Sequence, residues 1–138
     1  MVTLEDLYGH WIDHPDATPE RKAASTAFLL KARKLYDMAI ADHVVFPVNI
    51  RKTNTQVSGD VYGGFRPQSC PIGAPHSAHK EGQGLDWFDP EGKIDEWCMK
   101  NQGKLIACGI YIEHPDSTPG WSHWSDRAPG SGHHVFYP

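Results

Sequence analysis

The sequence predicts an α+β fold, in which a mainly antiparallel sheet has its helices packed on one side. Two patterns lead to this prediction: a long segment near the N-terminus has helical periodicity, and the second half of the chain alternates short apolar pieces with glycine- and proline-rich turns. The chain has 138 residues, of which 39% are hydrophobic and 22% charged. This length suits one core, so we expect a single domain over residues 1–138.

The first long element is a helix between Thr18 and His43. The sequence "TPE" supplies Thr18 as N-cap and Pro19 as the first helical residue. Apolar residues then recur at helical spacing, at Ala24, Phe28, Leu35, Met38 and Ala39. We expect this helix to cover the sheet, and the preceding residues 4–11 to form a short helix or to wrap against it.

A second helix is predicted over residues 91–102, because Ile94, Trp97 and Cys98 have the i, i+3, i+4 spacing of an amphipathic helix. The strand predictions rest on short apolar segments bounded by turn residues. Pro47 makes the first of them an edge or irregular strand, and the apolar run at 105–114 is expected to be central. The predicted strand segments are Val44–Ile50, 56–67, 83–88, 105–114, 121–126 and 133–138.

Composition excludes several classes of partner. The net charge is −4 with neutral histidines, which gives no general attraction to nucleic acid or to an anionic membrane. The start, "MVTLEDLYGHW", lacks the pattern of a signal peptide, so we expect synthesis in a cytosol and no membrane partner. Three widely spaced cysteines without a C-x-x-C pair favour buried, reduced thiols over a zinc knuckle.

The segment "HSAHKEGQGLDW" contains a candidate pair of metal ligands. Zinc sites use histidine nitrogen and carboxylate oxygen, and His79 and Asp86 supply one of each. Gly82 and Gly84, which lie between them, let the backbone turn so that a loop histidine and a strand aspartate can meet. The pair alone is moderate support for a site, and the neighbouring elements add to it.

The elements "GGFRP", "SAHKEGQGLD" and "GWSHW" together resemble the zinc D-Ala-D-Ala carboxypeptidase family, whose fold is shared with the hedgehog signalling domain. The family pattern of serine, histidine, glycine, a small residue and aspartate is matched by Ser77, His79, Gly82, Gly84 and Asp86. The small residue is usually alanine, so Gly84 departs mildly from the pattern. The resemblance covers residues 57–126, and the C-terminal "PGSGHHVFYP" resembles that of small phage-encoded members.

The resemblance implies a Zn²⁺ ion held by His79, Asp86 and His123, the last of these in "GWSHW". Strand alternation places Trp121, His123 and Ser125 on one face of the sheet. His133 and His134 are competing candidates for the third ligand and rank below His123. Ser77 is interpreted as a turn residue that shapes the site.

Two catalytic residues are predicted. Arg66, which follows "GGF", is expected to hold a substrate carboxylate or to stabilise an oxyanion. The family has an acidic general base three positions before the last histidine, and this sequence has Gly120 there. Asp116, Glu113 and Asp126 could replace that base, and Asp116 is preferred because its loop leads directly into the ligand strand.

Two functions remain open at this level. In the first, the chain is a phage-encoded zinc peptidase that cuts peptide bonds of bacterial peptidoglycan containing D-amino acids. In the second, it is a structural or virion protein that keeps the fold and the zinc without catalysis, with proteins of a phage particle as candidate partners. Either would be made in the bacterial host cytoplasm and act at the cell wall or in a virion.

Overall fold

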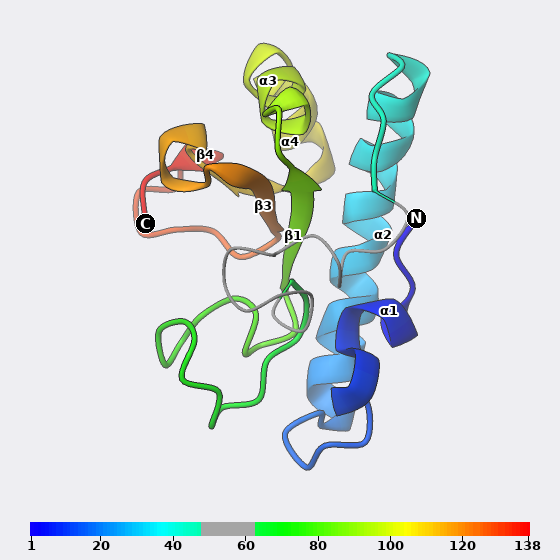
Figure 1. Cartoon of the computed structure of the whole chain (residues 1–138), viewed down its shortest axis with the longest axis vertical. Helices are drawn as coiled ribbons and strands as arrows, with labels where there is room; N and C mark the ends of the chain where they lie inside the picture. The colour runs from blue at the N-terminus through cyan, green and yellow to red at the C-terminus, as the bar shows by residue number, and fades with distance from the viewer. Residues whose placement is uncertain (48–62) are drawn as a thin grey trace.

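A computed structural model describes residues 1–47 and 63–138 of the chain. The fold is α+β, as predicted, and places its helices against a four-stranded sheet (Figure 1). The helices are α1 (Leu4–Tyr8), α2 (Pro19–Ala41), α3 (Lys93–Lys100) and α4 (Gln102–Cys108), with 3-10 turns η1 (Gly9–Trp11) and η5 (Pro115–Ser117). The strands are β1 (Gly84–Asp89), β2 (Tyr111–Glu113), β3 (Gly120–Ser125) and β4 (Val135–Phe136).

The sheet has the strand order β1-β3-β2-β4 and is mainly antiparallel, as predicted, although it is mixed because β2 and β4 pair in parallel. β3 pairs antiparallel with both β1 and β2, whereas β4 pairs parallel with β2. The parallel pair arises because β4 follows β3 in the chain but joins the far edge of β2. Two reversals of direction then leave β2 and β4 running the same way.

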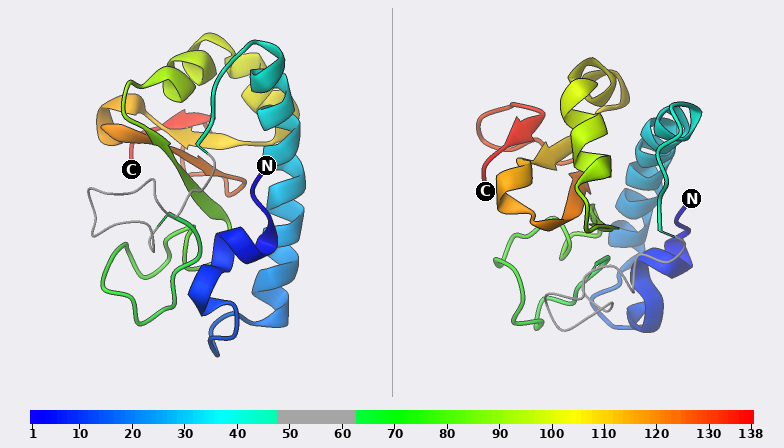
Figure 2. Two further views of the ribbon diagram at one scale, coloured as in Figure 1. Left: turned by 45° about the vertical axis from the view of Figure 1, so that its right-hand side comes forward. Right: turned by 45° about the horizontal axis from the view of Figure 1, so that its top comes forward.

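The long helix α2 forms as predicted and lies along one side of the molecule (Figure 2). The Thr18 hydroxyl accepts a hydrogen bond from the Arg21 backbone N–H at 3.2 Å, and Pro19 takes the first helical position. The buried stripe of the helix contains Ser25, Phe28, Ala32, Leu35 and Ala39. The helix predicted at 91–102 is present as the shorter α3, and the strands predicted at 83–88 and 121–126 are present within one residue of those bounds. The strand predicted at 133–138 is present as the shorter β4.

The predicted strand at 105–114 is wrong in its first half. Leu105 to Cys108 belong to α4, and only Tyr111–Glu113 pair in the sheet. Gly109 ends the helix in the left-handed region, at φ 70°, where glycine is favoured. The run contains the buried end of the helix, with Leu105 and Cys108, and the buried strand residue Ile112. An apolar run of this kind does not reveal where helix gives way to strand.

The two other strand predictions are only partly within the described residues. Residues 44–47 have no regular structure, and 48–50 lie outside the described part of the chain. In the predicted strand–turn segment 56–67, residues 56–62 lie outside the described part of the chain, and residues 63–67 have no regular structure.

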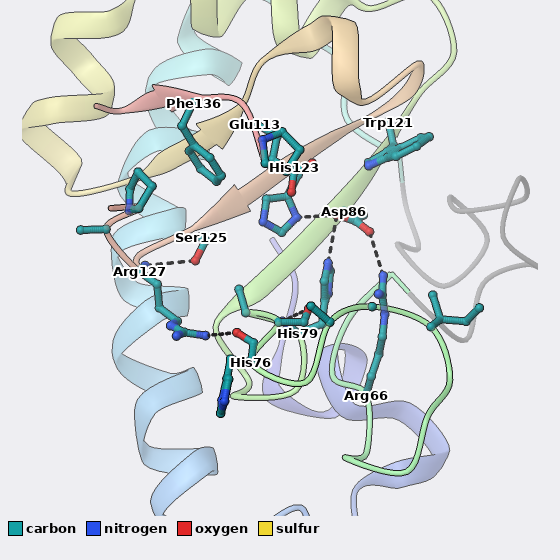
Figure 3. Close-up of a pocket in the computed structure, with 18 residues that line it drawn as sticks. Arg66, His76, His79, Asp86, Glu113, Trp121, His123, Ser125, Arg127 and Phe136 are labelled. Carbon is teal, nitrogen blue, oxygen red and sulfur yellow. Dashed lines mark hydrogen bonds and ion pairs between the residues drawn. The ribbon is translucent and has the colours of Figure 1, made fainter. Parts of the chain in front are cut away.

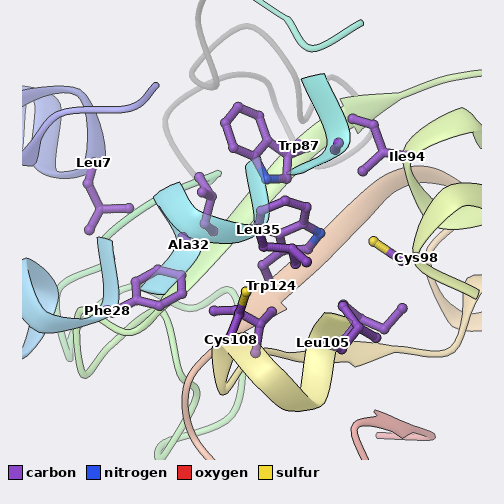
Figure 4. Packing of buried hydrophobic residues seen from close by; sticks show 14 of the residues in the cluster. Leu7, Phe28, Ala32, Leu35, Trp87, Ile94, Cys98, Leu105, Cys108 and Trp124 are labelled. Carbon is purple, nitrogen blue, oxygen red and sulfur yellow. The ribbon is translucent and has the colours of Figure 1, made fainter. Parts of the chain in front are cut away.

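The core fills the space between the helices and one face of the sheet (Figure 4). Trp87 of β1 and Trp124 of β3 lie on this face with ring centroids 5.6 Å apart in an edge-to-face arrangement, and both are at most 1% exposed. Alternation along each strand therefore sends the neighbouring residues, Asp86 and His123, to the opposite face. The core fixes which side of the sheet carries the polar residues.

The cysteines are buried and unpaired, as predicted. Burial raises the pKa of the Cys98 thiol, which keeps it protonated and unreactive. None of the helices in the described ranges is both long and apolar enough to cross a membrane.

One buried carboxyl group behind the sheet is incompletely satisfied. Asp95 Oδ2 accepts a hydrogen bond from the Thr118 hydroxyl at 3.1 Å, while Oδ1 has no partner among the described residues. Burial raises the pKa of Asp95 to about 6. Asp89 lies beside it and caps α3, accepting from the backbone N–H groups of Ile94 and Asp95 at 3.0 Å each.

We expect Asp95 to make folding stability depend on pH. Because its pKa is raised in the folded state, its contribution is fully present below its usual pKa near 4 and is lost as the pH rises past about 6. Asp95→Asn should remove this loss. As the pH rises from 4 to 7.5, the unfolding free energy of the variant minus that of the wild type should therefore increase by up to about 3 kcal/mol. Urea unfolding at both pH values measures the difference.

The control for this experiment is Asp116→Asn, since the Asp116 side chain is 79% exposed. Its unfolding free energy should follow the wild-type pH profile. Parallel profiles for Asp95→Asn and the wild type would contradict the prediction.

Candidate metal centre

His79, Asp86 and His123 meet on the face of the sheet opposite the core (Figure 3). Asp86 of β1 and His123 of β3 are direct partners across the antiparallel pair. His79 reaches them from the loop that precedes β1. All three are buried, and their candidate ligand atoms lie within 4.8 Å of one another. The structure thus brings together the three residues that the sequence nominated as metal ligands.

The distances within this triad suit a metal with nitrogen and oxygen ligands. Asp86 Oδ1 lies 2.8 Å from His123 Nδ1 and 3.2 Å from His79 Nε2. Ligand atoms held about 2.0–2.1 Å from a tetrahedral zinc ion are separated from one another by about 3.3 Å, which is close to these two distances. Two histidines and one carboxylate also leave one position open, which is the pattern of catalytic rather than structural zinc sites.

Glycines allow the ligand loop to pack closely against its surroundings. Gly82 has φ +73°, and a Cβ there would lie 2.4 Å from Ser25 Oγ of helix α2. A Cβ at Gly84 would lie 2.8 Å from the His79 backbone nitrogen. The Gly84 position, where the resembling family usually has alanine, is therefore in tight contact with a ligand residue in this chain.

The segment Gly63–Arg66 holds two of the ligands in place. The Gly64 carbonyl accepts a hydrogen bond from His79 Nδ1 at 2.9 Å, which leaves Nε2 of that ring directed at Asp86. The Gly63 carbonyl accepts from the Asp86 backbone N–H at 2.8 Å. Arg66 donates from its backbone N–H to the His79 carbonyl at 3.2 Å and from Nη2 to Asp86 Oδ2 at 3.3 Å. Such outer hydrogen bonds orient metal ligands and tune their basicity.

The electrostatics keep the carboxylate charged and one imidazole neutral. Burial favours the neutral acid of Asp86, but the attraction of His79 and the hydrogen bond from His123 outweigh it, and the pKa of Asp86 is lowered. Burial lowers the pKa of His79. Burial also opposes charge on His123, yet the hydrogen bond and charge of Asp86 raise its pKa. An ionised carboxylate beside a neutral imidazole is the form that binds a metal.

The triad lies in a pocket of about 530 Å³. Glu113 lines this pocket, because Ile112 faces the core and its neighbours on β2 face the other way. The register between β2 and β3, continued by one residue, sets Glu113 beside His123, and Glu113 pairs with Phe136 of β4. Asp86, His123, Glu113 and Phe136 therefore form one row across the four strands.

Glu113 is half-buried, and its side chain has no hydrogen bond or ion pair with another described residue. Burial raises its pKa, while the neighbouring charge of His123 acts in the opposite direction. A carboxylate without a structural partner, aimed into a pocket beside candidate metal ligands, is a group suited to accept a proton.

The carboxylate that the sequence favoured as base lies elsewhere. Asp116 is in turn η5, its side chain 79% exposed and 3.6 Å from His114 Nδ1, and it is not among the pocket-lining residues. Asp126 is occupied by Lys31 Nζ at 3.1 Å and by Gln83 Nε2 at 2.8 Å. Of the three carboxylates considered, Glu113 is the one that the pocket contains.

The structure also places the other polar residues that the sequence suggested for the site. Arg66 lines the pocket but is 6% exposed and paired with Asp86. Ser77 Oγ accepts from the His79 backbone N–H at 3.3 Å, the local turn bond that was expected. His134 bonds the Ile110 carbonyl at 2.7 Å through Nδ1 and stacks on Tyr111, so it is not part of the triad.

Two pocket residues were ranked too low or missed. Glu113 ranks below Asp116 in the sequence prediction, although alternation from the apolar Ile112 places the Glu113 side chain on the face away from the core. Arg127 was not singled out. It lines the pocket just beyond the end of β3, and alternation from His123 through Ser125 was the available signal.

Comparison of the chain with protein-family models, with curated proteins and with solved structures finds no match in any of the three. The assignment of this centre therefore rests on its geometry and on its donor atoms.

We expect the chain to bind one zinc ion per molecule and to be stabilised by it. A zinc concentration 100 times the dissociation constant should add about 2.7 kcal/mol to the unfolding free energy. Replacing His123 by alanine should abolish this binding, because the site loses one of its three protein ligands. Elemental analysis after chelation and reloading, together with thermal unfolding with and without zinc, measures both effects.

His134→Ala is the matched control, since His134 is a nearby histidine outside the triad. It should keep one zinc ion and the full thermal shift. Equal zinc binding by the wild type and by His123→Ala would contradict the assignment of the centre.

Proposed function

We propose that the chain is a zinc-dependent peptidase that hydrolyses D-amino-acid-containing peptide bonds of bacterial peptidoglycan, as its resemblance to zinc D-Ala-D-Ala carboxypeptidases suggests. The observation that carries the proposal is the buried triad of His79, Asp86 and His123. It lines a pocket that also contains Glu113, a carboxylate without a hydrogen-bond or ion-pair partner among the described residues. The same three ligands occur in the order and spacing of the resembling motif.

The proposed reaction would use a zinc ion and two residues of the chain in different roles. When bound, a zinc ion would supply a Lewis acid that polarises the scissile carbonyl and makes water more acidic. In this proposal Glu113 takes the proton of the attacking water and delivers it to the nitrogen of the leaving amine as the C–N bond breaks. Arg66, held against Asp86, acts as a positioning residue that keeps the carboxylate ligand charged and oriented.

The size and lining of the pocket support a peptide substrate. Its walls combine the aromatic rings of Trp121 and Phe136 with charged groups around the triad. An apolar lining with a few convergent polar groups is characteristic of small-molecule and peptide sites. Action at the cell wall, a phage origin and contacts with particle proteins follow from the resemblance and belong to this proposal.

A catalytically silent zinc protein is the second candidate, and one observation favours it. Gly120 occupies the position at which the resembling family has its acidic base. In that case zinc would serve only to stabilise the fold. The two candidates differ in whether Glu113 replaces the missing acid.

The direct test is incubation of the zinc-loaded chain with purified sacculi and with synthetic stem peptides ending in D-Ala-D-Ala. Peptidase function predicts new amino groups in the sacculi or released D-alanine, detected by mass spectrometry and absent after chelation. No cleavage of either substrate by zinc-loaded protein would favour the silent candidate.

Glu113→Gln should lower kcat by about 10²- to 10⁴-fold, because the amide can no longer accept the proton. Zinc content should stay at one per chain, since Glu113 is not in the triad. Asp116→Asn is the matched control and should leave kcat near the wild-type value. The reverse pattern, with the loss in Asp116→Asn, would identify the wrong base in this proposal.

A further inference from the structure

Arg127 occupies one end of the pocket. The residues of β3 that line the pocket are Trp121, His123 and Ser125, and Arg127 lines it just past the end of that strand. The triad therefore lies between an aromatic wall at Trp121 and a cation at Arg127, as Figure 3 also shows.

The guanidinium is held in place on the ligand-loop side of the pocket. The Arg127 backbone N–H donates to Ser125 Oγ at 3.0 Å, which fixes the turn after the strand. Its Nη1 donates to the carbonyl of His76 at 2.7 Å, three residues before the ligand His79. A guanidinium has five N–H donors, and only this one forms a hydrogen bond with another described residue.

Arg127 differs from the other arginines that the structure describes, because each of those lies near a described carboxylate. Arg21 lies 3.7 Å from Glu81, Arg33 lies 3.9 Å from Asp37, and Arg66 lies 3.3 Å from Asp86. Arg127 has no carboxylate within ion-pair distance in residues 1–47 and 63–138. It is thus a fixed cation whose counter-ion is not supplied by the described part of the chain.

We propose that Arg127 receives a carboxylate of the substrate and thereby determines which peptides the pocket accepts. The fork of an arginine side chain binds a carboxylate through two parallel hydrogen bonds, and these charge-assisted bonds are stronger than neutral ones. Arg66 is less suited to this role because Asp86 already engages its guanidinium. The proposal rests on the peptidase function above and adds to it the residue that recognises a substrate carboxylate near the cleaved bond.

The spacing limits where that carboxylate lies. Arg127 lies four positions after His123, so their Cα atoms are at most about 13 Å apart in extended chain. The Arg127 side chain turns back toward the ligand loop. A peptide residue in extended form spans about 3.3 Å. The carboxylate therefore lies within a few residues of the scissile bond, as either the C-terminal α-carboxylate or the side chain of an acidic residue.

The experiment measures binding and cleavage separately. Four short peptides are compared on the zinc-loaded protein. Two share one sequence and have a free or an amidated C-terminus, and two are amidated forms with either glutamate or glutamine next to the terminal residue. Calorimetry on zinc-loaded Glu113→Gln protein gives affinities without turnover, and kcat/KM is measured on protein with Glu113 intact. Arg127→Gln is made in both backgrounds.

We expect one of the two carboxylates to strengthen binding by about 10- to 100-fold over its amide, and Arg127→Gln to remove that preference. Arg127→Lys should restore part of it, and zinc content should be the same in all variants. Preference for the free C-terminus identifies the α-carboxylate as the group bound, and preference for glutamate identifies the side chain.

Equal binding of every acid and amide, no measurable binding of the acids, or an unchanged preference in Arg127→Gln would overturn the assignment. The cleavage measurement separates failure of the Arg127 assignment from failure of the proposed peptidase function. Cleavage with an unchanged preference in Arg127→Gln would refute Arg127 alone. A carboxylate preference lost in Arg127→Gln, without any cleavage, would refute the peptidase function and keep Arg127 as the binding residue.

Discussion

The buried carboxylate of Asp86 is the group on which the site depends. An ionised carboxylate removed from water is costly unless it is paired and hydrogen-bonded. Asp86 is 2% exposed and is contacted by His79, His123 and Arg66, which come from three separate segments of the chain. Removing any one of them leaves charge uncompensated in the interior, so the ligand loop, the strand pair and the "GGFR" segment are coupled through one side chain.

The surrounding fold supports this carboxylate from the core side. Trp87 and Trp124 bury one face of the β1–β3 pair, which fixes the register that sets Asp86 opposite His123. The Ser25 hydroxyl of α2 donates to the Gly82 carbonyl at 2.6 Å and so ties the ligand loop to the longest helix. The helices therefore contribute to the site without lining its pocket.

Much of this was readable from the sequence, because it depends on local patterns. The N-cap at Thr18 and the alternation in "GWSHW" each fix a feature within a few residues, and the motif around His79 and Asp86 nominated the ligands. The end of α4 inside an apolar run and the parallel pairing of β4 depend on tertiary contacts, so local sequence did not reveal them. Choosing Glu113 over Asp116 required knowing that β2 lies beside β3. Alternation alone predicts the face of the sheet on which a side chain lies, but not which strand is next to it.

X-ray absorption at the zinc edge of the loaded protein tests the central claim, that His79, Asp86 and His123 form the metal centre, most directly. We predict a four-coordinate ion with nitrogen and oxygen ligands at about 2.0–2.2 Å, including the signature of two imidazoles, and no sulfur. A sulfur shell near 2.3 Å, or a spectrum unchanged by His79→Ala, would contradict the account.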